Sequence, residues 1–510
     1  MSKIIVIGAG VGGMSVAARL ARQGHDVTIY EASDRAGGKC QTEWIGDYAF
    51  DTGPSLLTLP AIYKDFFLKT GARFERVLTI SAVNPSFSYY FADGKSLDFV
   101  NLDVPQTCDA IDRALGAKAG NAWHSIMQRA EVMWDISRVP FVQSELTSIW
   151  SLLKRRDLLW GIRQIAPFKT LRKVTSEYTQ DPHLQKIIDR YATYTGSDPR
   201  EAPAALLTIA FVESSFGAWH IAGGIGQLSI ALEDRCRLLN VDIHFNSDVT
   251  AITTQSEVVT GITLANGDFV SADIVVANAD AEIVYQQLLD STVKSANSER
   301  KKLKRAEKSL AGFSLLLGLD NSKVVGTPPI LKHHSIYFPE NYDAEFDEIF
   351  TQRIPVDDPT IYICAPNDPL MVKGENKESW FVLVNAPRHD PDNGCDWSVG
   401  GAEYAEKIIA KLDALGLQVS ERLEVMDFRT PRDLENTTKA PGGSIYGTAS
   451  NGAMSAFFRA KNRSPVQGLF CVGGSAHPGG GLPLVGISAE LVADAIGSVQ
   501  PVVTTPHHGH

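Results

Sequence analysis

Short apolar runs that end in glycines recur along the chain and predict buried strands leading into tight loops. The first run, Ile4 to Ile7, is rich in β-branched residues and precedes Gly8 to Gly13, after which an alanine-rich helical pattern covers Met14 to Gln23. Asp26 to Tyr30 reads as a second strand. This order of strand, glycine turn, helix and strand predicts a unit with a phosphate-binding turn.

The glycines of this first turn suit the pyrophosphate of a dinucleotide. Gly8 permits the tight turn, Gly10 lets the backbone approach the phosphates, and Gly13 lets helix and strand pack closely. Glu31 follows Gly13 by 18 residues, close to the spacing of about 20 at which a carboxylate accepts hydrogen bonds from an adenosine ribose. We therefore predict that a dinucleotide contacts Gly8, Gly10, Gly12, Gly13 and Glu31. The alternative is a glycine turn without a ligand.

Two segments after Glu31 offer further groups to the same ligand. Arg35 has planar donors suited to phosphate and precedes a glycine pair and Lys39. Asp51 to Ser55 is a tight turn whose bare backbone could lie against a flat ring. The predicted cofactor contacts in these segments are Arg35, Gly38, Lys39, Gly53, Pro54 and Ser55. The alternatives are a surface salt bridge for Arg35 and a plain turn at Gly53-Pro54.

The end of the chain repeats the strand-and-glycine pattern. Gly468 to Gly474 resembles a buried strand, Ser475 to Gly486 is rich in glycine and proline, and a helical pattern covers Ile487 to Ile496. A second helix start so far along the chain suits one long ligand such as FAD, with its ribityl chain and flavin at this loop. His477 could act as a base, or it could fix the loop or line the flavin edge, and the second interpretation is favoured. The predicted contacts are Gly474, Leu482, Pro483 and Val485.

Strand patterns in the middle of the chain indicate that the nucleotide-binding part is discontinuous. Val241 to Phe245, Val249 to Thr253 and Val258 to Leu264 read as strands, Asn266-Gly267 as a hairpin turn, and Ala272 to Ala279 as a returning buried strand. The substrate part must then be inserted between the blocks. Further cofactor contacts are expected at Ala32, Asp248 and Val249.

These blocks predict an α/β fold, in which a Rossmann-like FAD-binding domain is interleaved with an α+β substrate domain made of a β-sheet and helices. The FAD-binding domain is assigned to residues 1–85, 220–300 and 425–500. The substrate and membrane-contact domain is assigned to residues 86–219 and 301–424. Residues 501–510 are expected to form a disordered tail.

Composition and charge exclude several classes of protein. A net charge of −11 over 510 residues argues against a nucleic-acid partner, which normally needs a basic face. The six cysteines contain no C-x-x-C pair, so a reduced, cytosolic protein without a metal site is expected. No apolar stretch reaches the ~18 residues of a spanning helix, and no export signal is recognised.

Together these motifs resemble the bacterial phytoene desaturase family of FAD-dependent carotenoid desaturases, which belongs with the amine-oxidase-like flavoproteins. The resemblance is carried by Gly8 to Lys39, Val276 to Asp280, Gly442 to Gly447 and Val472 to Val485, and the most specific piece is His477 to Pro483. Within the family, Arg190 to Ser197 and the Gly473-Gly474-Ser475 loop look most similar to hydroxycarotenoid 3,4-desaturases.

The resemblance implies a two-electron dehydrogenation of a polyene, in which FAD takes a hydride and a proton leaves the neighbouring carbon. A hydrocarbon C–H bond has no polar group on which an acid could act. The protein is therefore expected to orient the substrate and to exclude water. No catalytic base is assigned. Asp135, Arg138 and Glu213 lie in the predicted substrate region, but each is expected to be a structural ion. Quinone or oxygen is the electron acceptor that the resemblance implies.

A carotenoid dissolves in bilayers, so the enzyme is expected to dock on a membrane. The stretch from Arg138 to Lys173 carries eight basic residues against two acidic ones, interleaved with tryptophan and leucine. This composition is typical of an interfacial helix on anionic lipid, although an ordinary amphipathic helix is the alternative. The expected location is cytoplasmic, at the inner face of the cell membrane.

Two other functions remain open for a flavoprotein with these motifs. A flavin amine oxidase would need an aromatic cage and usually a lysine near the flavin, and the closing loop argues against it. An FAD-containing polyene isomerase would change double-bond geometry without net redox turnover.

The second basic cluster, Arg300 to Lys308, is expected to be a solvated helix face.

Overall fold

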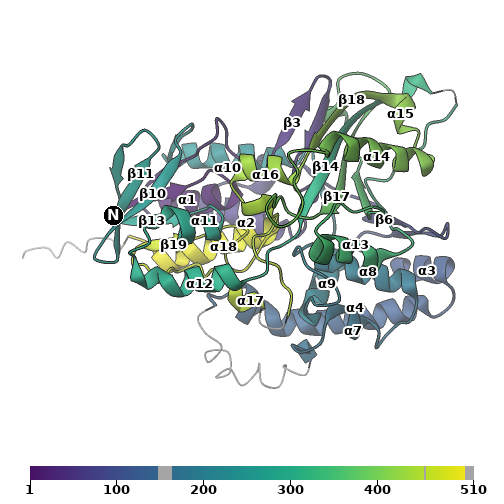
Figure 1. The fold of residues 1–510 in the computed structure, drawn as a ribbon, viewed down its shortest axis with the longest axis horizontal. Coiled ribbons are helices and arrows are strands. Elements are labelled where there is room, and N and C mark those ends of the chain that lie inside the picture. Colours follow the sequence, from purple (N-terminus) through teal and green to yellow (C-terminus); the bar gives the residue numbers. More distant parts are fainter. Residues whose placement is uncertain (147–163, 325, 453–454, 500–510) are drawn as a thin grey trace, which may run out of the picture.

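A five-stranded parallel sheet organises one half of the molecule and a seven-stranded mixed sheet the other (Figure 1). The computed structural model describes residues 1–146, 164–324, 326–452 and 455–499. The predicted α/β class, with a Rossmann-like sheet and a second part made of sheet and helices, is confirmed.

The five-stranded sheet is built from three separated parts of the chain. Its strands, in spatial order, are β19 (Leu469–Cys471), β13 (Ile274–Ala277), β1 (Lys3–Ile7), β2 (Asp26–Tyr30) and β9 (Asp242–His244). β1 is central, since Ile4 pairs with Val27 on one side and with Ile274 on the other. A strand covered on both faces must be apolar throughout, which explains the unbroken run Ile4 to Ile7.

The side chains on the two faces of β1 pack in different hydrophobic cores. Ile4 and Val6 pack against helices α1 (Val11–Arg22), α2 (Ala61–Thr70), α10 (Gly226–Leu238) and α18 (Leu482–Ile496). Ile5 and Ile7 pack against a three-stranded antiparallel sheet of β10 (Val249–Gln255), β11 (Val258–Leu264) and β12 (Phe269–Ser271). This layering buries both faces of the parallel sheet and leaves the carboxyl ends of its strands for a ligand.

The seven-stranded sheet carries the rest of the molecule. Its order is β18 (Leu423–Arg429), β14 (Ala311–Asp320), β17 (Lys377–Ala386), β16 (Ile361–Cys364), β15 (His334–Tyr337), β6 (Phe87–Tyr90) and β7 (Ser96–Phe99). Helix α14 (Gly401–Ala414) packs on the β14 end. Helices α3 (Val104–Leu115), α4 (Ala119–Ser137), α8 (Pro182–Thr193) and α9 (Leu207–Phe216) pack on the β6 end.

Smaller elements join these two halves. The hairpin of β3 (Thr42–Ile45) and β4 (Tyr48–Asp51) packs through Tyr48 and Phe50 on the seven-stranded sheet. β5 (Ile80–Ala82) pairs with β8 (Trp219–Ile221). The remaining α-helices of the described residues are α7 (Leu171–Thr175), α11 (Ala281–Ile283), α12 (Asn297–Arg305), α13 (Tyr342–Phe346), α15 (Val419–Arg422), α16 (Pro431–Thr438) and α17 (Ser455–Phe458).

The sequence analysis predicted the start of two helices too late in the chain. α1 begins at Val11 rather than Met14, and α18 begins at Leu482 rather than Ile487. In both cases the last residues of the glycine loop already form the first helical turn, because glycine and proline are tolerated where the N–H groups have no intrahelical partner. The predicted strand at 272–279 is also shorter, since Asn278 onward belongs to the loop.

Much of the predicted membrane stretch, residues 147–163, and the predicted tail at 501–510 lie outside the described residues. The flanks of the stretch are described, and Leu146 and Ile165 pack together in a small apolar cluster. Among the described residues no helix is both long and apolar enough to cross a membrane. The residue limits given for the two domains remain predictions.

Candidate cofactor and substrate sites

The first glycine loop joins β1 to α1 and is packed too closely for side chains. Gly8 has a φ of +93°, and a Cβ on Gly13 would lie 2.1 Å from the Gly8 carbonyl oxygen. Gly10 is the N-cap of α1, and no side chain caps this helix. The first turn of α1 therefore presents backbone N–H groups where an anion would be bound.

Glu31 lies beside this loop at the end of β2. Its carboxylate accepts the Ala9 N–H at 2.6 Å and the N–H and hydroxyl of Ser33 at 2.9 and 2.8 Å. The Ser247 N–H donates to the Glu31 carbonyl oxygen at 2.8 Å, which brings Asp248 and Val249 to the same end of the sheet as Glu31 and its neighbour Ala32. Asp248 is paired with Lys439 at 2.5 Å.

The segment Arg35 to Lys39 lies across the first glycine loop. The Gly37 N–H donates to the Ala9 carbonyl oxygen at 2.9 Å. Arg35 is 59% exposed and forms an ion pair with Glu43 at 2.8 Å, the surface contact given above as the alternative. In this arrangement its guanidinium is directed to Glu43.

Lys39 is turned inward and bridges to the Gly442–Gly447 segment. Its Nζ donates to the carbonyl oxygens of Ser444 at 3.1 Å and Ile445 at 2.9 Å. Burial lowers the pKa of the Lys39 ammonium and raises the pKa of the Asp280 carboxyl, while the attraction between the two charges opposes both shifts. Lys39 thus ties the amino-terminal loops to the carboxyl-terminal part of the chain.

Asn278, which directly follows β13, is the residue on which the loops of both chain ends meet. A Cβ on Gly12 or on Gly473 would lie 2.6 Å from its Oδ1, and a Cβ on Gly10 would lie 2.8 Å from its Nδ2. One side chain therefore imposes glycine on loops far apart in sequence. The sequence analysis gave Asn278 no role in the site, although a polar residue ending the buried run Ile274 to Ala277 was a usable signal.

Helix α18 begins in the same region as α1. Gly481 is its N-cap with a φ of +95°, no side chain caps it, and Pro483 lies in its first turn. A Cβ on Gly12 would lie 3.2 Å from Val485, and the Leu482 carbonyl oxygen accepts the Tyr63 hydroxyl at 2.7 Å. Two glycine-capped helix N-termini at one sheet edge provide the donors and the space that a phosphate-bearing ligand such as FAD requires.

Arg459 holds the closing loop and was missed by the sequence analysis. It is buried, and it donates to the carbonyl oxygens of Tyr446 at 2.9 Å, Gly474 at 2.7 Å and Thr448 at 3.0 Å. Burial lowers the pKa of this guanidinium to about 10. No periodic pattern surrounds Arg459, so the sequence offered no signal for it.

The turn from Gly53 to Ser55 packs on the Arg35–Lys39 segment. A Cβ on Gly53 would lie 1.8 Å from the Lys39 carbonyl oxygen. Asp51 fixes the start of the turn by accepting the Ile225 N–H at 2.9 Å, and burial raises the pKa of this carboxyl to about 6. Gly53 therefore has no room for a side chain, and the turn lies directly against the loop beside α1.

His477 is a buried part of the closing loop. Its Nε2 lies 2.9 Å from the Ser144 carbonyl oxygen, and its backbone N–H donates to the Ala460 carbonyl oxygen at 2.8 Å. Burial lowers the pKa of the imidazole to about 4. These contacts favour the interpretation in which His477 fixes the loop.

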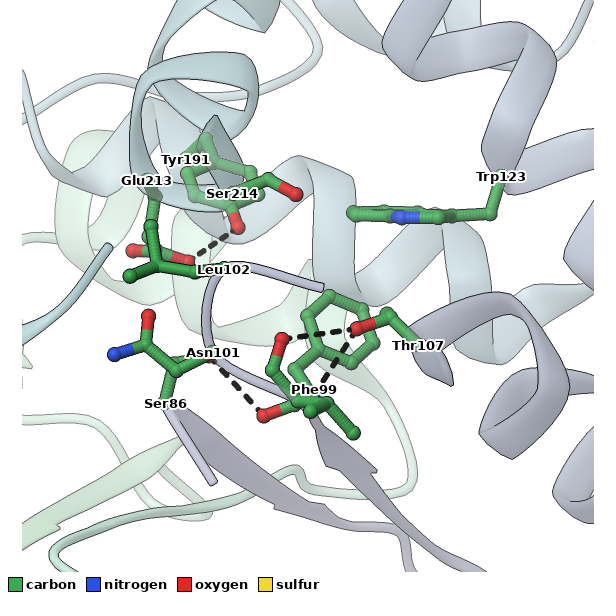
Figure 2. Close-up of a pocket in the computed structure, with 10 residues that line it drawn as sticks. Ser86, Phe99, Asn101, Leu102, Thr107, Trp123, Tyr191, Glu213 and Ser214 are labelled. Carbon is green, nitrogen blue, oxygen red and sulfur yellow. Dashed lines mark hydrogen bonds between the residues drawn. The ribbon is translucent and has the colours of Figure 1, made fainter. Parts of the chain in front are cut away.

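Glu213 is the one buried residue among the three polar candidates of the substrate region. Its carboxylate accepts the hydroxyls of Tyr191 at 2.6 Å and Tyr194 at 2.9 Å, and it pairs with Arg190 at 3.5 Å. Figure 2 shows Glu213 and Tyr191 at a small pocket that Trp123 and Ser214 also line. Because Glu213 is buried and pairs with the buried Arg190, the contacts support a structural ion, as expected. Asp135 is exposed.

A family model described as flavin containing amine oxidoreductase matches residues 11–306. Among solved structures, the fold is similar to a putrescine oxidase variant, with a TM-score of 0.66, 13% identity and coverage of 97% of this chain and 98% of that one. It is also similar to an oxidoreductase from Methanosarcina mazei, with a TM-score of 0.63, 16% identity and coverage of 96% and 100%.

Curated relatives match almost end to end. A 4,4'-diapolycopene oxygenase from Methylomonas sp is 31% identical over 97% of this chain and 98% of the relative. A 1-hydroxycarotenoid 3,4-desaturase from Flavobacterium sp. is 31% identical over 97% and 99%. A zeta-carotene-forming phytoene desaturase from Myxococcus xanthus is 31% identical over 97% and 93%.

Proposed function

Because the chain belongs to the flavin-containing amine oxidoreductases, and within them groups with the carotenoid desaturases, we propose that it desaturates a carotenoid polyene with FAD. The observation that supports this most is the convergence of two glycine-capped helix N-termini and Glu31 at one edge of the parallel sheet. Such a site suits FAD, and relatives that match over their whole length carry carotenoid names.

The proposed FAD site extends from Glu31 to the start of α18. Glu31 would take the adenosine ribose, because its carboxylate is already held by Ala9 and Ser33. The N-termini of α1 and α18 would hold the phosphates and the flavin end through their backbone N–H groups. The further proposed contacts are Gly8, Gly10, Gly12, Gly13, Ala32, Arg35, Gly38, Lys39, Gly53, Pro54, Ser55, Asp248, Val249, Gly474, Leu482, Pro483 and Val485.

The chemistry follows from the nature of the substrate. FAD, when bound, supplies the acceptor for the hydride. The protein would orient the polyene and exclude water. Arg459 and Lys39 hold the loops of the site through backbone carbonyl groups and are not assigned to proton transfer.

Within this class we favour a hydroxycarotenoid 3,4-desaturase, because a relative of that name matches 99% of its length. A carotenoid oxygenase is the second candidate, because several of the relatives are named as diapolycopene or diaponeurosporene oxygenases. Incubation of purified protein with phytoene, neurosporene and a hydroxylated carotenoid separates these functions. A new double bond supports desaturation, and incorporation of oxygen supports the second candidate. Aldehyde with peroxide from an amine indicates an amine oxidase, and a change of geometry alone indicates an isomerase.

Docking on the cytoplasmic face of the membrane through residues 138–173 is part of the proposal. The described flank supports it, because the Phe168 side chain is 89% exposed and Val139 is 47% exposed. The Ser144 contact with His477 also connects the beginning of the stretch to the closing loop. Substrate drawn from a bilayer would then enter beside the proposed flavin end.

Reoxidation by a membrane quinone or by oxygen completes the proposed cycle. Stopped-flow mixing of the reduced enzyme with each acceptor tests this directly. Return of the oxidised flavin spectrum within the turnover time identifies the acceptor, and failure of both acceptors contradicts the proposal.

A further inference from the structure

A chain of hydrogen bonds leads from the Gly53–Ser55 turn to a buried histidine. Ser55 Oγ lies 2.6 Å from the Tyr362 hydroxyl oxygen, and that oxygen lies 2.8 Å from Nδ1 of His334. Tyr362 is on β16 and His334 opens the neighbouring β15, so both side chains are held by the ladder of the seven-stranded sheet. This series of hydrogen bonds therefore connects the substrate half of the molecule with the turn proposed to face the flavin.

His334 is enclosed and neutral. It has no exposed surface, and its ring stacks on Phe87 at 5.1 Å and on Tyr362 at 5.9 Å. Burial lowers the pKa of the imidazole well below its ordinary value. A neutral imidazole carries one N–H and one lone pair, so the contacts of its two nitrogens decide where the proton lies.

The two nitrogens of His334 have different surroundings. Nδ1 faces the Tyr362 hydroxyl, whereas Nε2 is buried and has no hydrogen-bond partner among the described residues. Leaving an N–H group unpaired in the interior is costly, and unpaired buried donors are rarer than unpaired acceptors. The proton therefore lies on Nδ1, and His334 donates to the Tyr362 hydroxyl oxygen.

This tautomer fixes the direction of the remaining bonds. Tyr362 accepts from His334, so its own hydroxyl proton is donated to Ser55 Oγ. Ser55 accepts that bond, so its own hydroxyl proton remains available to another acceptor. The Cys364 thiol lies beside both hydroxyls, but sulfur is a weak acceptor.

We propose that Ser55 donates a hydrogen bond to the isoalloxazine ring of FAD, and that Tyr362 and His334 are positioning residues that fix the direction of this bond. The inference rests on the FAD site proposed above. A donor directed at the ring stabilises it when it is electron-rich, so the three residues make the bound flavin easier to reduce.

A metal site is the rival interpretation of the same cluster. His333, His334 and Cys364 offer ligand atoms within 4.8 Å of one another. The separation between His333 Nδ1 and Cys364 Sγ is 3.8 Å, a contact of hydrogen-bond type, and burial raises the pKa of the Cys364 thiol, which disfavours the thiolate that binds a metal. We therefore interpret the cluster as a polar network.

The test is an anaerobic titration of flavin-loaded protein against a redox dye. At the dye ratio that half-reduces the wild-type flavin, Tyr362→Phe and Ser55→Ala should each lower the ratio of reduced to oxidised flavin about tenfold, the effect of losing one directed hydrogen bond. Tyr337→Phe is the matched control, because Tyr337 lies on β15 and stacks on Tyr90 at 4.5 Å, apart from the chain. Its flavin should titrate as the wild type does.

Two further variants separate direction from packing. His334→Asn keeps an N–H donor toward Tyr362 and should retain the wild-type ratio, whereas His334→Leu should match Tyr362→Phe. Flavin content and thermal unfolding verify that each variant is folded and loaded. An unchanged ratio in loaded Tyr362→Phe, or a wild-type ratio in His334→Leu, overturns the inference. Absence of flavin from the wild-type protein instead overturns the FAD proposal itself.

Discussion

Gly13 illustrates how much of the proposed site is decided by single atoms. Its φ is not in the left-handed region, so any residue could adopt its backbone conformation; the obstacle is the Gly8 carbonyl oxygen, 2.1 Å from where a Cβ would lie. A carbonyl group within a tight turn has little freedom to move. The close approach of helix and strand therefore depends on the absence of one methyl group.

Gly13→Ala should lower the free energy of unfolding by about 1–3 kcal/mol and reduce flavin content, because the added methyl group pushes α1 away from β1. Gly394→Ala is the control, since its φ is not left-handed either and the atoms nearest its Cβ belong to the flexible Arg353 side chain, at 3.2 Å. Thermal unfolding and the ratio of flavin to protein absorbance measure the two effects. Equal behaviour of the two variants would contradict the steric account.

The site residues that could be predicted from the sequence are those whose partners lie close to them in the chain. Glycines next to an apolar run could be predicted, because the strand, the turn and the helix are consecutive in the chain. Asn278 and Arg459 were not assigned to the site. The end of the apolar run made Asn278 a candidate, but the partners of both residues, the Gly12 loop and the Gly474 carbonyl oxygen, lie far away in sequence. The contact of Arg35 with phosphate stays a prediction, and in the structure its guanidinium pairs with Glu43.

At the level of elements, α13 contributes a buried carboxyl to the contact with the seven-stranded sheet. Glu345 accepts the Asn385 side-chain amide and the Thr360 N–H, both at 2.7 Å. Burial raises its pKa from 4.5 to about 7. The unfolded chain therefore loses this proton first, and the free energy of unfolding falls as the pH rises between these two values.

Glu345→Gln should remove this part of the pH dependence. The free energy of unfolding of the variant relative to the wild type should rise between pH 5 and pH 8, by on the order of 1–3 kcal/mol, because only the wild type must bury a charge at the higher pH. Chemical denaturation near pH 5 and near pH 8 provides the comparison, with the exposed Glu403→Gln as control. A constant difference between Glu345→Gln and wild type at both pH values would contradict the prediction.

The predicted membrane role of the basic stretch from Arg138 to Lys173 rests on its composition and on its described flanks. Replacing Lys154, Arg155 and Arg156 by glutamate should weaken binding to anionic vesicles by ~100-fold or more, at about 1 kcal/mol per basic residue. The same charge change at Lys301, Lys304 and Arg305 on α12 is the control and should have little effect. Unchanged co-sedimentation of the first variant would contradict a membrane role for the stretch.

For the whole molecule, the order of strands along the chain explains why the proposed site involves both ends. β1 lies between β2 and β13, and β19 joins the same sheet from the last part of the chain. The α/β class and the discontinuous sheet could be predicted from apolar runs that end in glycines. A β-sheet in the second part was also predicted. The strand order of the seven-stranded sheet, with its parallel pairing of β15 and β6, could not be predicted, because it depends on contacts that no local pattern encodes.

The most direct test of the central claim is an anaerobic single-turnover experiment on purified, flavin-loaded protein. Flavin bleaching is followed by absorbance, and the carotenoid is analysed by mass spectrometry after mixing with phytoene, neurosporene or a hydroxylated carotenoid. We predict that one of these substrates bleaches the flavin and gains one double bond per flavin reduced. A purified protein that binds no flavin, or a product that gains oxygen or changes only its geometry, would contradict FAD-dependent desaturation.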